Sequence, residues 1–115
     1  MRILVANGPR LYRHTVAALL RVQRSQDTVL TSAPARLDRA LLRHAPDLVI
    51  CSHLTAGVQV GPPAWLLLYP GGADWGVFCA DGQRTVLDGI TFADLLACVD
   101  RAAAQVDGRA ALERP

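Results

Sequence analysis

Cys51, Ser52 and His53 place two kinds of nucleophile and a base side by side in the chain. A base activates a nucleophile when the two side chains lie within hydrogen-bonding reach. Neighbours on a strand point to opposite faces, so Cys51 and His53 share a side that Ser52 does not. No glycines flank Ser52 in the manner of a nucleophile elbow. We therefore expect no catalytic residue, and an enzyme built on Cys51 or Ser52 stays as a third functional alternative.

A second polar group follows the first apolar run of the chain. Asn7, Gly8 and Arg10 lie between a strand pattern and a helix pattern, where proteins with parallel sheets hold anions at a helix N-terminus. Ser52 and His53 follow another strand pattern and belong to the same group. The segment matches neither GxGxxG nor a P-loop. These five residues are the expected site if the chain binds a small molecule or an anion.

The cysteines and histidines favour neither a disulfide nor a metal site. Cys51, Cys79 and Cys98 are odd in number and widely spaced, and His14 and His44 have no metal-ligand spacing with His53. We expect no metal and no cofactor. The longest apolar run, AWLLLY, is far shorter than a membrane span. The start, MRILVANG, lacks the apolar core of a signal peptide, so a cytoplasmic protein without membrane contact is expected.

Charge is distributed unevenly along the chain. Residues 1–45 hold eight arginines and two acids, for a charge of +6, whereas residues 46–115 hold four arginines and eight acids, for −4. All the basic residues are arginine, so any mechanism that needs a lysine ammonium is excluded. The arginines of the first half fall on two helices, aromatic residues are few, and no nucleic-acid motif occurs. We therefore expect solvated helix faces and no nucleic-acid partner.

Hydrophobic periodicity places the elements that would position these groups. Strands are expected at residues 2–6, 27–33, 47–52 and 65–70. A helix follows Pro9, and its expected inner stripe is Leu11, Thr15, Ala18, Leu19 and Val22. A second helix at residues 34–45 is capped by Ser32 and has the inner stripe Leu37, Ala40, Leu41 and His44, with Arg36, Arg39 and Arg43 facing outward.

The second half of the chain departs from this alternation of strands and helices. Residues 55–64 hold two glycines and two prolines, so a third helix is expected to be missing or vestigial. Asp81-Gly82 lies between two β-rich arms within residues 75–89 and predicts a hairpin. Thr91 and Asp94 resemble a capping box. They open a last helix with the inner stripe Phe92, Leu95, Leu96, Val99, Ala103 and Val106.

Residues 2–52 and 85–103 resemble the receiver domain of response regulators. RILVANG is similar to the first strand of that family, RHAPDLVICS to its second helix and third strand, and TVLDGITFADLLACV to its fifth strand and last helix. The resemblance implies an α/β fold with a doubly wound, mostly parallel sheet of the flavodoxin or CheY type. The chain adds a C-terminal antiparallel hairpin and has fewer helices than a full receiver.

The residues that carry phosphoryl transfer in receivers are replaced here. Asn7 and Gly8 stand at the acidic pair that would hold Mg²⁺, and Ser52 stands at the phosphate-accepting aspartate. The switch threonine or serine corresponds to Tyr69, and the conserved lysine falls near Asp88. The resemblance therefore implies a degenerate pseudo-receiver that works without phosphorylation.

One domain at residues 1–107 is expected, followed by a polar, frayed tail at 108–115. Because a helix layer is missing, the strands WLLLYP and GVFCA would expose apolar side chains, and such a patch marks an interface. The expected interface residues are Trp65, Leu67, Tyr69, Trp75 and Phe78. The favoured function is a regulatory or scaffolding module that acts through protein contact, as a homodimer or with a protein partner. The small-molecule site described above is the second alternative.

Overall fold

A six-stranded sheet with helices on both faces forms the body of the protein. The computed structural model describes the backbone of residues 1–113 and the side chains of residues 1–109. The strands are β1 (Arg2–Ala6), β2 (Thr28–Thr31), β3 (Leu48–Cys51), β4 (Ala64–Leu68), β5 (Trp75–Ala80) and β6 (Gln83–Asp88). The helices are α1 (Arg10–Gln23), α2 (Leu37–His44), α3 (Ala56–Val60) and α4 (Phe92–Glu113), with short 3₁₀ turns η1 (Pro34–Arg36) and η2 (Pro70–Gly72).

The strands lie in the order β2-β1-β3-β4-β5-β6. The pairs β1–β2, β1–β3 and β3–β4 are parallel, and the pairs β4–β5 and β5–β6 are antiparallel. The expectation of a doubly wound, mostly parallel flavodoxin or CheY-type sheet is therefore wrong, because the C-terminal part of the sheet is antiparallel. The hairpin about Asp81-Gly82 is confirmed, since β5 and β6 pair on either side of that turn.

A short connection causes this change of direction. Six residues separate the end of β4 at Leu68 from the start of β5 at Trp75, whereas a parallel crossover needs a dozen or more. Tyr69, Gly71 and Gly72 all have positive φ, which folds the chain back within η2. The Tyr69 N–H then donates to the Trp75 carbonyl at 3.1 Å and opens the antiparallel ladder.

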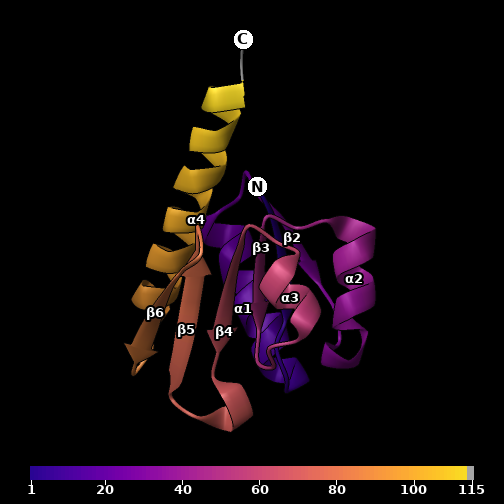
Figure 1. Ribbon diagram of the computed structural model, residues 1–115. Helices are drawn as coiled ribbons and strands as arrows, with labels where there is room; N and C mark the ends of the chain where they lie inside the picture. Colours follow the sequence, from indigo (N-terminus) through magenta and orange to yellow (C-terminus); the bar gives the residue numbers. More distant parts are fainter. Residues whose placement is uncertain (114–115) are drawn as a thin grey trace.

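Two hydrophobic clusters hold the helices against the two faces of the sheet. Figure 1 shows α2 and α3 in front of the strands, α1 behind them, and α4 running past the end of the sheet. On the α1 and α4 side, the sheet contributes Ile3, Val5, Ile50, Leu66, Leu68 and Phe78. On the α2 and α3 side, it contributes Leu4, Val49, Cys51, Trp65 and Leu67. The alternation of strand side chains thus fills both layers.

The second cluster corrects the expected apolar surface. Trp65 is 2% exposed, and Leu67 and Phe78 are also buried. The short helix α3 covers these strand side chains, although the sequence predicted that this helix layer would be missing. A hydrogen bond from the Val58 N–H to the Thr55 side chain caps α3. Among the expected interface residues, only Trp75 is an exposed large apolar side chain within residues 1–109.

The helix α1 turns a different face to the sheet than the sequence predicted. Val16, Ala17 and Leu20 are its buried residues. The expected stripe of Leu11, Thr15, Ala18, Leu19 and Val22 is wrong, because all five are exposed. Both sets recur at helical spacing, so periodicity alone does not select between two apolar faces on one helix.

Polar contacts fix the ends of the helices. Arg24 at the end of α1 forms ion pairs with Asp27 at 2.7 Å and with Asp100 of α4 at 3.1 Å, and α1 and α4 pack on the same face of the sheet. The capping box of α4 is confirmed: the Thr91 N–H donates to the Asp94 carboxylate and the Asp94 N–H to the Thr91 hydroxyl. The bonds that the Thr91 N–H and the Thr91 hydroxyl donate to the Asp94 carboxylate hold its pKa below the usual value.

Two other expectations about helix ends are wrong. Ser32 does not cap η1 or α2, since η1 begins after Ala33 and the Ser32 hydroxyl donates to the Ala33 carbonyl at 3.0 Å. The tail expected to fray from Gly108 is helical through Glu113, and residues 114 and 115 lie outside the described residues. An ion pair at 3.5 Å between Arg109 and Asp81 ties the end of α4 to the β5–β6 turn.

Gly76 is the position of β5 where a side chain is least tolerable. A Cβ atom there would strike the Leu67 carbonyl of β4 and the side chain of Ile90. We expect Gly76→Ala to lower the free energy of unfolding by about 1–3 kcal/mol through overpacking, measured by urea denaturation. Gly108→Ala is the control: it lies on α4 with open space around it, and it should stabilise the fold by about 0.5–1 kcal/mol. Equal effects of the two substitutions would contradict the close approach of β4 and β5.

Candidate functional site

The strand-end residues expected to bind a ligand mostly form hydrogen bonds within the protein. The side-chain amide of Asn7, which is buried, donates to the Leu68 carbonyl at 3.0 Å and so joins the ends of β1 and β4. The Gly8 N–H donates to the Ser52 hydroxyl at 2.9 Å, and Arg13 donates to the Asn7 carbonyl at 3.3 Å. Three of the five expected residues, Asn7, Gly8 and Ser52, are therefore brought together as a loop-fixing network.

The other two expected ligand residues point elsewhere. Arg10 is exposed and donates to the His14 imidazole one helical turn away, at 3.3 Å. His53 is exposed. One polar atom of the network is left over: among the described residues, the side-chain oxygen of Asn7 is buried without a donor. Leaving such an acceptor unpaired costs about 1–3 kcal/mol. The hydrogen bonds of the strand-end group therefore hold its loops together with one acceptor unsatisfied.

Cys51 has the opposite environment to that of a nucleophile. Burial raises the pKa of its thiol to about 12, against a smaller opposing effect of the hydrogen bond with the His53 backbone. A reactive thiol requires a lowered pKa and access to solvent. Cys98 is also buried, which raises its pKa, whereas Cys79 is only partly buried. The triplet Cys51-Ser52-His53 thus brings no exposed nucleophile to a base.

Tyr69 has a structural place at the turn after β4. Its hydroxyl donates to the Ile90 carbonyl at 2.7 Å, which fastens the chain just before α4. Burial raises the pKa of this phenol, and the nearby Asp74 carboxylate adds to the effect. The ring lies 5.9 Å from that of Tyr12 of α1. Tyr69 thus links the first helix, the β4–β5 turn and the start of the last helix.

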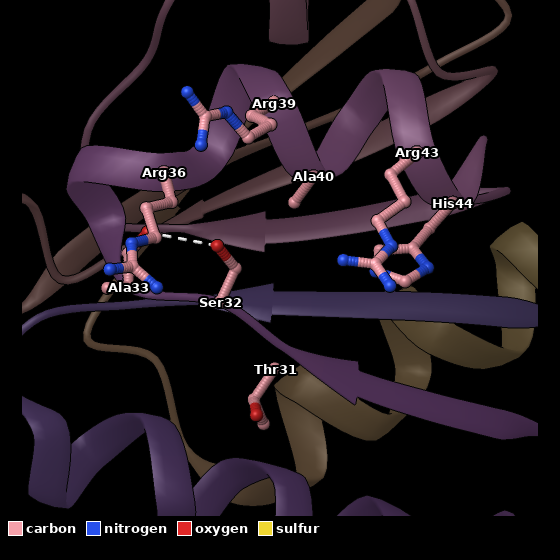
Figure 2. A pocket seen from close by; sticks show the side chains of 8 residues that line it. All are labelled: Thr31, Ser32, Ala33, Arg36, Arg39, Ala40, Arg43 and His44. Carbon is pink, nitrogen blue, oxygen red and sulfur yellow. Dashed lines mark hydrogen bonds between the residues drawn. The ribbon is translucent and has the colours of Figure 1, made fainter.

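A hollow of about 310 Å³ between α2 and the end of β2 gathers the positive charge of the first half of the chain. We call it the arginine hollow. Its lining residues are Thr31, Ser32, Ala33, Arg36, Arg39, Ala40, Arg43 and His44. In Figure 2, Arg36 of η1 and Arg43 of α2 extend toward the Ser32 side of the hollow, whereas Arg39 of α2 points away from Ser32. Two guanidinium groups, an imidazole and the Ser32 hydroxyl thus lie around one space, with a third guanidinium at its rim.

The charge of the arginine hollow has no acidic counterpart within its lining, as far as the structure describes it. Asp38 belongs to the same helix, but its carboxylate accepts a hydrogen bond from the Thr55 hydroxyl at 2.8 Å, on the α3 side. Arg39 is four residues from Arg43 on α2, so two like charges adjoin along the helix and weaken it, and Arg36 at the end of η1 adds a third. A bound anion would relieve this repulsion and accept forked hydrogen bonds from guanidinium groups.

The sequence predicted these arginines to face outward, and they are exposed. It did not predict that they would line a common hollow with Ser32 and His44. The available signal was the spacing of Arg36, Arg39 and Arg43 along one helix directly after an edge strand. The hollow itself depends on how α2 fits over the short strand β2, which no local sequence pattern indicates.

Comparison of the chain with protein-family models, with curated proteins and with solved structures finds no match. The resemblance to receiver domains therefore stays a prediction. Within residues 1–113, no helix has the length and apolar character that crossing a bilayer demands. The described residues also bring together no group of three or more histidine, cysteine or acidic side chains that could hold a metal ion.

The burial of the cysteines predicts the order in which they react. Under brief treatment with iodoacetamide at neutral pH, we expect Cys79 to be alkylated first and Cys51 and Cys98 to react only slowly, as located by tandem mass spectrometry. In denaturant all three should react alike, because the protection comes from the fold. Preferential alkylation of Cys51 in the folded protein would contradict its assignment to the core. It would instead support the alternative that the chain is an enzyme built on Cys51.

Proposed function

We propose that this chain is a non-catalytic binding module that recognises an anionic group at the arginine hollow. The observation that carries the proposal is the convergence of Arg36, Arg43 and His44 on one space that Ser32 also lines, with Arg39 at its rim. A hollow of this size is at the lower end of ligand-binding cavities, which suits a small phosphorylated or polycarboxylate ligand. Anion binding was expected at the strand ends; the proposal moves it to the edge of the sheet.

A non-catalytic role is supported by the state of the other reactive groups. Cys51 is buried with a raised pKa, and Ser52 accepts a hydrogen bond from Gly8. Arginine holds a phosphate or carboxylate without taking part in proton transfer, because its guanidinium stays protonated. The arginine hollow is thus equipped to bind an anion and to hold it in place.

Anion binding should depend on the residues of the arginine hollow. We expect inorganic pyrophosphate to bind the protein at low ionic strength, as measured by calorimetric titration, and to raise the melting temperature. Arg36→Gln and Arg43→Gln should each weaken binding by about 10-fold, as expected for the loss of a charge-assisted hydrogen bond. Added sodium chloride should weaken binding further by screening.

Arg10→Gln is the matched control for this titration. It removes the same charge from an exposed arginine of the strand-end group, outside the arginine hollow. Its affinity for pyrophosphate should stay close to that of the unmodified protein. An equal loss with Arg10→Gln would show general electrostatic attraction or a strand-end site, and unchanged binding by Arg36→Gln and Arg43→Gln would contradict the proposal.

The exposed face of α1 favours a second candidate function, that of a regulatory or scaffolding module acting through protein contact. Leu11 and Val22 are each 75% exposed, and Leu19 and Tyr12 are exposed beside them. The helix carries arginines and a histidine but no acid. An apolar stripe with basic flanks is complementary to an amphipathic helix that carries carboxylates.

This second function predicts binding of an acidic amphipathic helix to α1. A synthetic peptide with leucines at helical spacing and glutamates elsewhere should bind the protein, as measured by fluorescence anisotropy. Leu11→Ser combined with Val22→Ser should weaken that binding at least about 10-fold while leaving the melting temperature unchanged, because both side chains are exposed. A scrambled peptide of the same composition is the control. Equal affinity for both peptides would contradict recognition by the apolar stripe.

A further inference from the structure

The sheet ends in β6, a strand whose outer edge is open to solvent in the described part of the chain. It pairs with β5 at every position from Gln83 to Asp88, so its backbone is regular. The opposite edge strand, β2, is four residues long and is soon followed by Pro34. A regular edge strand without proline is a template for pairing with another strand. Of the two edges, β6 is therefore the one prepared for such pairing.

The geometry of the hairpin fixes which backbone groups of β6 point outward. Asp81 and Gly82 both have positive φ, as in a two-residue turn of type I′. Beyond the other end of the strand, the Gly89 N–H donates to the Asp74 carbonyl at 2.9 Å. Hydrogen-bonded residues alternate along an antiparallel ladder. Gln83, Thr85 and Leu87 therefore bond to β5, and the N–H and C=O groups of Arg84, Val86 and Asp88 point away from the sheet.

We propose that two copies of this chain associate by antiparallel pairing of β6 with β6, about a two-fold axis at Val86. In this register Val86 faces Val86 of the partner, and Arg84 faces Asp88 of the partner on both sides of the axis. The three outward residues of each copy then form the hydrogen-bonded pairs, which gives about six main-chain hydrogen bonds. The contact is self-complementary, as a two-fold interface requires.

Charge selects this register over its neighbours. The backbone groups that point outward belong to every second residue. Two copies of β6 can therefore form hydrogen bonds only in registers that differ by two residues. A shift of two in either direction places Val86 opposite Arg84 or opposite Asp88, and both cross-strand ion pairs are lost. Directly opposed opposite charges stabilise an antiparallel pair, whereas unmatched ones do not. The order Arg84, Val86, Asp88 thus specifies one pairing of β6 with itself.

The surroundings of β6 leave room for a second copy. Gln83 and Thr85 are exposed on the α4 side, and Val86 is 66% exposed on the other side, next to Val77 of β5. In the single chain, the Arg84 guanidinium lies over the ring of Trp65 and donates to the Gln59 side chain at 3.3 Å. Pairing would exchange that exposed, neutral acceptor for a carboxylate, and charge-assisted bonds are the stronger kind.

The pairing goes beyond anion binding and does not depend on it. The arginine hollow lies at β2, and β6 is the opposite edge of the sheet. A dimer formed through β6 would carry its two hollows at the two ends of one continuous sheet, both open to ligand. A failure of pyrophosphate binding would leave the oligomeric state untouched, and the reverse also holds.

Charge reversal across the proposed axis tests the pairing by sedimentation velocity. The unmodified chain should sediment as a dimer at micromolar concentration. Asp88→Arg should shift it to a monomer, because arginines would then face each other on both sides of the axis. Asp88→Arg combined with Arg84→Asp restores opposite charges in the same register and should restore the dimer. The double variant has the net charge of the unmodified chain and is therefore the matched control.

Val86→Arg is a second variant that leaves the contacts of Arg84 in place. It puts two like charges at the axis and should also give a monomer, and an unchanged melting temperature would show that the fold persists. A monomeric unmodified chain would overturn the proposal. A dimer that survives both Asp88→Arg and Val86→Arg would also overturn it, because the chains would then associate through another surface.

Discussion

Burial of the three central strands on both faces is the constraint on which the rest of the structure depends. β1, β3 and β4 carry apolar side chains that point alternately to the two sides, and nearly all are buried. Such strands need a helix layer on each face. α1 and α4 cover one face, and α2 with the single-turn α3 covers the other. The hydrogen bond from the Asn7 amide to the Leu68 carbonyl then joins the carboxyl ends of β1 and β4. The strand ends therefore have a structural role.

The short link between β4 and β5 determines which strand forms the second edge of the sheet. With six residues in place of a crossover, the chain returns as a hairpin beside β4. The sheet thereby acquires a regular open edge at β6, while its other edge is β2, beside the arginines of η1 and α2. The two proposed contacts, an anion at the arginine hollow and a second copy at β6, follow from these opposite edges. The exposed stripe belongs to α1, which covers the face of the sheet opposite to α2.

Much of the fold could be predicted from the sequence, because local signals marked its elements. The run at residues 2–6, the Asp81-Gly82 turn and the Thr91–Asp94 box are each read from a few residues. The inner face of α1 could not be predicted, since two apolar stripes compete and only packing chooses Val16, Ala17 and Leu20. The cover of Trp65 by the five-residue α3 was missed because its helical pattern is too short to recognise. The arginine hollow was missed because it depends on the fit of α2 over β2.

The most direct test of this account is to locate the anion on the unmodified protein. Uniformly ¹⁵N-labelled chain would be titrated with inorganic pyrophosphate at low ionic strength while amide chemical shifts are followed. The account predicts saturable shifts concentrated at residues 31–33 and 36–44, around the arginine hollow. Shifts concentrated at Gly8, Ser52 and His53 would contradict it and would place the anion at the strand ends.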